Sequence, residues 1–197
     1  MAVTDEPESD LGVWIGRVAA AVRGGATIVQ VRAKQASPRD LLDIVKQLVP
    51  ALPVPVLVND RADIAIMAGA AGVHVGADDV PIAPIRAFAP PAFIIGASLG
   101  SRAELETARG ADYVGIGPVF CTESKADAGS PLEFGEITEL QRLAGVPAVA
   151  IGGISVANAR EVLDACPCLA GVAALSSLFG AADVETAARA LRDAIGR

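Results

Sequence analysis

Short apolar runs alternate along the chain with longer segments in which apolar residues recur every three or four positions. The short runs are rich in Val and Ile, as buried strands are, and the longer segments have the period of amphipathic helices. Eight strands are predicted, at Ala2–Thr4, Ile28–Arg32, Val56–Asn59, Val73–Gly76, Phe93–Ala97, Tyr113–Gly117, Ala148–Ile151 and Gly171–Leu175. Helices are predicted between them, most clearly at Pro38–Val49, Ala103–Arg109, Val156–Ala165 and Val184–Ile195. Three of these helices follow the N-cap candidates Ser37, Ser155 and Asp183.

This alternation predicts the fold class. Strand and helix alternate for eight rounds without hairpin signals, which favours a parallel sheet closed as a (β/α)8 TIM barrel. The chain has 197 residues, fewer than the roughly 250 typical of that fold, so its loops must be short. We therefore expect a single domain over residues 1–197, with a very short first strand unless the native chain begins upstream. An open doubly wound sheet is the alternative.

Composition excludes several classes of function. A hydrophobic content of 52% supports one sizeable core, but no apolar run reaches the roughly 18 residues that cross a membrane. The acidic start MAVTDEPESD lacks the features of a secretory signal, so a cytoplasmic location is expected. A net charge of −7 and 4% aromatic residues argue against a nucleic-acid partner. The C-P-C of Cys166 and Cys168 lacks the second ligand pair that zinc would need.

Polar side chains gather where the predicted strands end, which in a TIM barrel is the reactive face. In TIVQVRAK the alternation of a strand puts Gln30, Arg32 and Lys34 on one face and Val29 and Val31 on the other. We expect the three polar side chains to point into the mouth of the barrel.

Two acidic residues end the third and fourth strands, which are neighbours in a barrel. The carboxylates of Asp60 and Asp79 can therefore face one small volume. Two carboxylates that leave coordination positions open suit Mg²⁺, which usually completes its shell with water and substrate phosphate. The alternative is that they cap the helices expected near Arg61 and after Pro81. The cations on the second strand favour a Mg²⁺-diphosphate site.

The later strand ends carry groups suited to phosphate. The turn at Gly152-Gly153 can expose backbone N–H groups, and Ser176 and Ser177 precede a short helical turn. The loop GPVFCTESKADAGSP adds two hydroxyl groups and an ammonium group suited to a diphosphate leaving group. These are carried by Thr122, Ser124 and Lys125.

Three further side chains are interpreted as structural. Cys121 has no His or second Cys nearby in the sequence, so we expect it to pack rather than to act as a nucleophile. His74, inside the apolar strand GVHVG, is expected to be a satisfied core residue rather than a base. Trp14 could lie in the core or in a subunit interface, which leaves a homo-oligomer open.

The chain resembles the thiamine phosphate synthases almost from end to end. The motifs that carry the resemblance are VTD, TIVQVRAK, VNDRADIAIMAGAAGVHVGADD, GPVFCTESKADAG, AIGGISVANA and GVAALSSLFGA, in the family's order. The resemblance implies an eight-stranded barrel that uses Mg²⁺ to join hydroxymethylpyrimidine diphosphate to thiazole phosphate. The products are thiamine phosphate and diphosphate. The implied mechanism is dissociative: diphosphate leaves first, and the thiazole nitrogen captures the stabilised pyrimidine cation.

The resemblance also implies a role for each motif residue. It gives Asp60 and Asp79 as Mg²⁺ ligands, Arg32, Lys34 and Lys125 as the cations that hold the diphosphate, Gln30 and Asn59 as contacts to the pyrimidine or its diphosphate, Ser98 as a neighbour of the pyrimidine, Thr122 and Ser124 as neighbours of the phosphates, and Gly153, Ser176 and Ser177 as the thiazole phosphate site.

Two positions depart from the family pattern. Gly76-Ala77 stands where Gly-Gln is usual, and Leu99-Gly100 stands where the family has a His. A thiazole tautomerase is the alternative within the fold, but its catalytic His would fall at Gly100 and it lacks an acid matching Asp60. A catalytically silent barrel that binds thiamine precursors is a further alternative, against which the retained metal and diphosphate residues argue.

Overall fold

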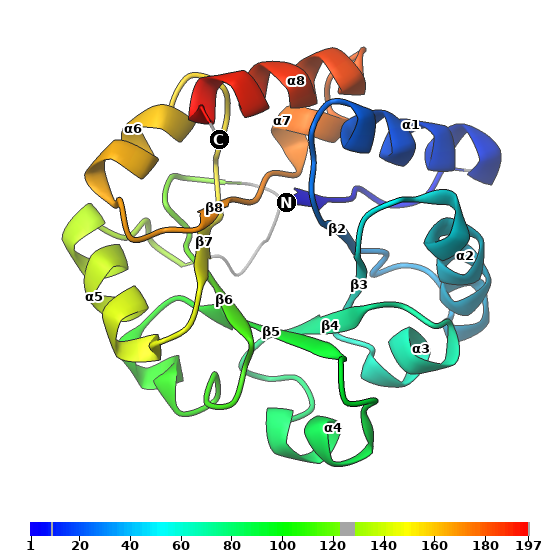
Figure 1. The fold of residues 1–197 in the computed structure, drawn as a ribbon, viewed down its shortest axis with the longest axis horizontal. Coiled ribbons are helices and arrows are strands. Elements are labelled where there is room, and N and C mark those ends of the chain that lie inside the picture. The colour runs from blue at the N-terminus through cyan, green and yellow to red at the C-terminus, as the bar shows by residue number, and fades with distance from the viewer. Residues whose placement is uncertain (9, 123–128, 197) are drawn as a thin grey trace.

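The computed structural model describes residues 1–8, 10–122 and 129–196. Within these residues, eight parallel strands form one sheet in which each strand pairs with the next along the chain. The sheet is curled, and the helices lie outside it (Figure 1). The strands are β1 Ala2–Val3, β2 Val29–Val31, β3 Val56–Asn59, β4 Gly72–Val75, β5 Ile94–Leu99, β6 Tyr113–Ile116, β7 Ala148–Ala150 and β8 Gly171–Val172.

The helices of the described residues cover the outer surface of the curled sheet (Figure 1). They are α1 Leu11–Arg23, α2 Pro38–Ala51, α3 Ala62–Met67, α4 Ile82–Phe88, the 3₁₀ helix η1 Arg102–Leu105, α5 Phe134–Ala144, α6 Ala159–Ala165, α7 Ser176–Phe179 and α8 Val184–Ile195. None of them is long and apolar enough to cross a membrane.

Hydrogen bonds join the first strand to the segment that follows the last one. Ala2 and Ala174 form an isolated parallel bridge. The Val3 N–H donates to the Ala174 carbonyl at 2.9 Å, and the Ala174 N–H donates to the Met1 carbonyl at 3.2 Å. The first strand is very short, as predicted, and these bonds hold it beside the chain that follows β8.

Side-chain caps explain where several helices begin. Ser37 accepts a hydrogen bond from the Asp40 N–H at the start of α2, and Asp183 accepts one from the Thr186 N–H at the start of α8. Both N-cap predictions are confirmed. Trp14 of α1 is fully buried, so it lies in the core.

The predicted helix Ala103–Arg109 is wrong. The segment forms η1 followed by turns, and η1 buries none of its residues. A helix this short depends on an apolar face that packs against the core, and here Leu105 is only partly buried. A 3₁₀ turn is the form that such short segments adopt.

The predicted start of the sixth helix is also wrong. Helix α6 begins at Ala159 rather than Val156, and its N-cap residue is Asn158 rather than Ser155. The Asn158 amide accepts from the Ser155 N–H at 2.8 Å and donates to the Gly153 carbonyl at 2.9 Å. Residues 156–158 form a turn held by these side-chain bonds.

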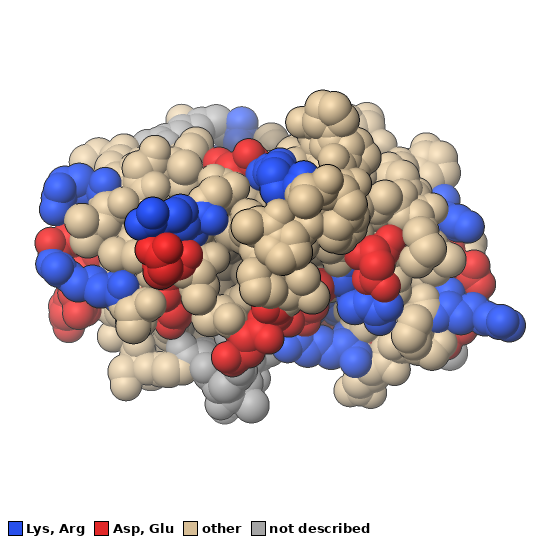
Figure 2. All heavy atoms as spheres, turned by 90° about the horizontal axis from the view of Figure 1, so that it is seen from below, with Lys and Arg blue, Asp and Glu red and all other residues tan. Residues whose placement is uncertain are grey.

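Charged side chains are scattered over the outer surface. Figure 2 views the molecule from the side of α4, where acidic and basic side chains are interspersed around an uncharged area. The described residues on this face form no continuous basic stripe, which a nucleic-acid backbone would require.

Two strand-initial glycines offer a matched test of this sheet. A Cβ added to Gly72 would overlap the carbonyl of Ile94 on the next strand, whereas one added to Gly171 meets no described heavy atom within 4 Å. We expect Gly72→Ala to lower the free energy of unfolding by about 3 kcal/mol and Gly171→Ala by less than about 0.5 kcal/mol. Urea denaturation followed by circular dichroism measures both. Equal effects would contradict the close approach of β4 and β5.

Candidate active site

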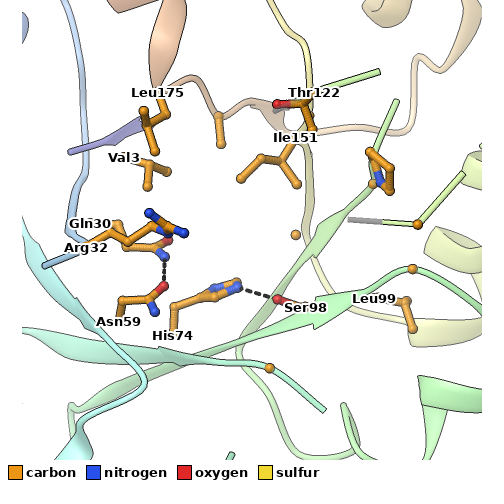
Figure 3. A pocket seen from close by; sticks show the side chains of 18 of the residues that line it. Val3, Gln30, Arg32, Asn59, His74, Ser98, Leu99, Thr122, Ile151 and Leu175 are labelled. Atoms are coloured by element: carbon orange, nitrogen blue, oxygen red, sulfur yellow. Dashed lines mark hydrogen bonds between the residues drawn. The ribbon is translucent and has the colours of Figure 1, made fainter. Parts of the chain in front are cut away.

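A cavity of about 540 Å³ lies at the carboxyl ends of the strands (Figure 3). It brings together predicted site residues that are far apart in the sequence. Those that line it are Gln30, Arg32, Lys34, Asn59, Asp60, Asp79, Ser98, Thr122, Gly153 and Ser176.

One described residue of the predicted site is not part of this lining, and two predicted residues are not described. Ser177 does not line the cavity, and its hydroxyl oxygen is buried without a hydrogen-bond partner among the described residues. Ser124 and Lys125 lie outside the described residues. Cys121 is exposed, so the expectation that it packs is wrong, whereas the expectation that it is not a nucleophile stays a prediction.

Asp60 has an unusual backbone conformation immediately after β3. Its φ is 66°, in the left-handed region that residues other than glycine rarely adopt. The Arg61 N–H donates to the Asn59 carbonyl at 2.8 Å, which is the bonding pattern of a γ-turn, and the Asp60 N–H donates to the His74 carbonyl at 2.8 Å. A tight turn anchored to β4 therefore aims the Asp60 carboxylate.

The Asp60 carboxylate faces Asp79. Burial, a hydrogen bond with Asp79 and the charge of Asp79 raise the pKa of Asp60 to about 6. Lys34 opposes this rise, with its Nζ 4.0 Å from Asp60 Oδ2. The two carboxylates therefore share one small volume, as the sequence predicted.

Neither carboxylate caps a helix. The residue before α3 is Arg61 and the residue before α4 is Pro81, and neither helix has a side-chain cap bond. Asp79 instead accepts from the Gly76 N–H at 2.7 Å. The capping alternative is therefore wrong for both.

The carboxylate pair fits a magnesium ion. No group of three or more His, Cys, Asp or Glu side chains that could hold a metal is found among the described residues. Mg²⁺ needs only one or two carboxylates when water and substrate phosphate complete its shell. Asp60 and Asp79 line the cavity and lie close enough for Asp79 to raise the pKa of Asp60. Together they supply that donor set.

Backbone bonds hold the loop that carries the cations after β2. The Arg32 N–H donates to the buried Thr4 hydroxyl at 3.0 Å, and the Lys34 N–H donates to the Glu6 carboxylate at 2.8 Å. The side chains of Arg32 and Lys34 line the cavity. Thr4 and Glu6 position this loop, a role that the sequence analysis missed because their partners are 28 residues away.

Two amide side chains form the wall beside the acidic pair. Gln30 is 4% exposed, and its Nε2 donates to Asn59 Oδ1 at 2.7 Å (Figure 3). Because each amide orients the other, both present fixed hydrogen-bonding groups to the cavity.

His74 is buried and hydrogen-bonded, as expected, but it also lines the cavity. Its Nδ1 lies 2.9 Å from the Tyr113 hydroxyl and its Nε2 lies 3.1 Å from Ser98 Oγ (Figure 3). Gly96 and Gly115 leave room for the two rings, since a Cβ at Gly96 would overlap the Tyr113 ring and one at Gly115 would lie 3.3 Å from His74. Burial raises the pKa of Tyr113.

Backbone N–H groups line another part of the cavity, at Gly152 and Gly153. Gly152 and Gly153 have φ values of 97° and 65°, and a Cβ on either would come within 2.7 Å of the loop at Pro118 and Phe120. Their N–H groups donate to no other described residue. Together with the first N–H groups of α7, they are suited to bind an anion.

Comparison with families of known proteins decides the assignment. The family model described as thiamine monophosphate synthase matches residues 1–178. The chain belongs to this family. The thiamine-phosphate synthase of Methanoculleus marisnigri is 44% identical over 186 residues, which cover 92% of this chain and 86% of that protein. The thiamine-phosphate synthase of Roseiflexus castenholzii is 41% identical over 196 residues, which cover 97% and 85%.

A solved structure agrees with the family assignment. Thiamine phosphate pyrophosphorylase from Pyrococcus furiosus is similar with a TM-score of 0.85 and 37% identity, over 99% of this chain and 94% of that one. The resemblance that the motifs implied is therefore confirmed. This member of the thiamine monophosphate synthase family has an α/β fold with eight parallel strands in a curled sheet.

The two departures from the thiamine monophosphate synthase pattern lie at the cavity rim. Ala77 and Gly100 both line the cavity as small residues. Glu104 lines it as well, and its carboxylate accepts from the Gly100 N–H at 2.8 Å and from the Ser101 hydroxyl at 3.2 Å. The Glu104 carboxylate therefore holds the turn at Gly100 and Ser101.

The acidic pair should cost stability when no cation is added. Because the pKa of Asp60 is raised to about 6, ionising this carboxyl in the fold costs stability relative to the unfolded chain, and this cost is fully present above pH 6. We expect Asp60→Asn to raise the free energy of unfolding at pH 8 in EDTA by about 1 kcal/mol, a value discounted because the side chain is 32% exposed. Asn also tolerates the left-handed conformation.

Asp63→Asn is the matched control, measured by the same urea denaturation. Its carboxylate pairs with Arg61 at 2.6 Å, which lowers the pKa of Asp63. Its neutralisation should give no gain in stability. A gain at Asp63 equal to that at Asp60 would contradict the crowding of Asp60 and Asp79.

Proposed function

We propose that the chain joins hydroxymethylpyrimidine diphosphate to thiazole phosphate in the cavity described above, with Mg²⁺, to give thiamine phosphate and diphosphate. As a member of the thiamine monophosphate synthase family the chain is an enzyme, a transferase. One observation carries the proposal: the Asp60 and Asp79 pair shares a cavity with the side chains of Arg32 and Lys34. A diphosphate with its metal ion needs both kinds of charge in one place.

We also propose that the sheet is a closed eight-stranded barrel and that residues 1–197 form a single domain. The hydrogen bonds that join Ala2 and Val3 to Ala174 support closure. The buried residues of strands and helices form one hydrophobic core, which supports a single domain.

The groups around the acidic pair would bind the diphosphate. Asp60 and Asp79 would hold Mg²⁺, which when bound would neutralise negative charge that develops on the leaving diphosphate. Arg32 and Lys34 would contact the diphosphate oxygens, and the resemblance adds Lys125 to them. Stabilising the leaving group is the main demand of a dissociative reaction, in which diphosphate departs before the new bond forms.

The remaining residues would hold the two organic groups in position. Gln30, Asn59 and Ser98 lie on the wall beside the acidic pair and would orient the pyrimidine. The donors at Gly153 and Ser176 would bind the thiazole phosphate, with Ser177 close to them, and Thr122 and Ser124 would contact the phosphates. Positioning of this kind removes much of the entropic cost of joining two molecules. The attacking thiazole nitrogen carries no proton, so no general base is required.

The first experiment incubates the chain with both substrates and follows thiamine phosphate and diphosphate together, in Mg²⁺ and in EDTA. We expect equal amounts of the two products in Mg²⁺ and none in EDTA. Asp60→Asn and Asp79→Asn should each lower kcat by at least about 100-fold, because each removes charge that holds the ion. A folded chain that binds thiazole phosphate but forms no product would favour a tautomerase or a silent binder instead.

The role of Lys34 can be tested against a second lysine. We expect Lys34→Gln to lower kcat/KM for the pyrimidine diphosphate by about 100-fold, because an ammonium group beside the diphosphate is lost. The control is Lys46→Gln on the exposed side of α2, which should leave kcat/KM within about twofold of the parent, as expected for a surface change. Similar losses in both variants, measured in initial-rate assays, would argue against a specific diphosphate contact.

A further inference from the structure

Three side chains from neighbouring strands form a hydrogen-bonded line that ends at the cavity. Tyr113 on β6 contacts His74 on β4, and His74 contacts Ser98 on β5. Figure 3 shows the imidazole of His74 beside Ser98, with both at the cavity wall. His74 is 9% exposed and Tyr113 is 9% exposed, whereas Ser98 is more accessible. Tyr113 therefore forms the buried end of the line and Ser98 the end that meets a ligand.

The buried end fixes the direction of every bond in the line. Within the described residues, the polar partner of the Tyr113 hydroxyl is His74 Nδ1. If that hydroxyl accepted from Nδ1–H, its own proton would be buried without an acceptor among the described residues, which is unfavourable. The Tyr113 hydroxyl therefore donates to Nδ1. A neutral imidazole that accepts at Nδ1 carries its proton on Nε2, and this N–H donates to Ser98 Oγ.

We propose that His74 is a positioning residue that sets the polarity of Ser98. With its oxygen engaged by the Nε2–H of His74, the Ser98 hydroxyl is left to donate its proton into the cavity. The group that takes this proton is therefore a hydrogen-bond acceptor of the ligand, such as a pyrimidine ring nitrogen or a phosphate oxygen. The identity of that ligand rests on the proposed function, whereas the tautomer of His74 does not.

The strands are built to hold this line. Gly96 and Gly115 flank His74 and Tyr113, and side chains there would occupy the space of the two rings. The rings lie 5.5 Å apart between centroids with a tilt of 41°. Because the imidazole is hydrogen-bonded at both ring nitrogens, its orientation is held before a ligand binds, which reduces the entropy lost on binding.

The tautomer can be read directly because His74 is the one histidine in the sequence. We would label the full-length protein with ¹⁵N-histidine and record two-bond ¹H–¹⁵N correlations of the imidazole at pH 7.5, without ligand. We expect the Nε2–H tautomer, with Nδ1 as the unprotonated nitrogen. The Nδ1–H tautomer, an imidazolium or an even mixture of tautomers would overturn the proposal. This readout needs no substrate, so it stands even if the proposed reaction fails.

Kinetics of variants test whether the line acts through Ser98. We expect Tyr113→Phe to lower kcat/KM for the pyrimidine substrate by about 10-fold and to convert the imidazole to a tautomer mixture, since the donor that fixes Nδ1 is lost. In the Ser98→Ala background the same change should have an effect of less than about twofold, because the group it orients is gone. If Tyr113→Phe lowers kcat/KM by the same factor in the parent and in the Ser98→Ala background, the two residues act independently and the proposal is overturned.

The control for hydroxyl loss is Thr138→Val on α5. Its hydroxyl donates to the Phe134 carbonyl on the outer layer, away from the residues that line the cavity. It should leave both kcat/KM and the imidazole spectrum unchanged. If Tyr113→Phe proves unstable, the spectrum of the unmodified protein still decides the question.

Discussion

The parallel register of very short strands is the constraint on which the rest of the structure depends. Within the described residues, no strand exceeds six residues, and β1 and β8 have two each. Parallel strands end at one edge of the sheet, so a wall this short leaves little depth between the core and the mouth. His74 and Tyr113 are consequently buried among apolar strands and yet close to the cavity. His74 lines the cavity, and Tyr113 is hydrogen-bonded to His74.

The acidic pair at this mouth is unfavourable for the stability of the fold. Burial and Asp79 both disfavour the charged form of Asp60, and the backbone of Asp60 lies in a conformation that L-residues rarely adopt. Lys34 offsets this only in part, from 4.0 Å away. Such an arrangement becomes favourable when a ligand brings a cation and an anion together, as a diphosphate with its metal ion does. A bound cation would therefore offset the cost of holding the two carboxylates together.

Sequence patterns predicted those features whose causes are local. The strand Val56–Asn59 and the helix Val184–Ile195 have the predicted bounds, because an apolar run and an Asp N-cap define them within a few residues. The segment after Ser101 did not follow its helical propensity, since too little of it reaches the core. The role of His74 could not be predicted either. Its partners are 24 and 39 residues away, and only the register of three strands brings them to it.

Two hydrogen bonds of His74 connect parts of the site that differ in chemistry. Its main-chain carbonyl accepts from the N–H of Asp60, while its imidazole contacts Ser98. The turn at Asp60 and the hydroxyl of Ser98 thus both contact one residue of β4. The spacing between the Asp60 turn and Ser98 therefore depends on one residue of β4 rather than on two independent loops.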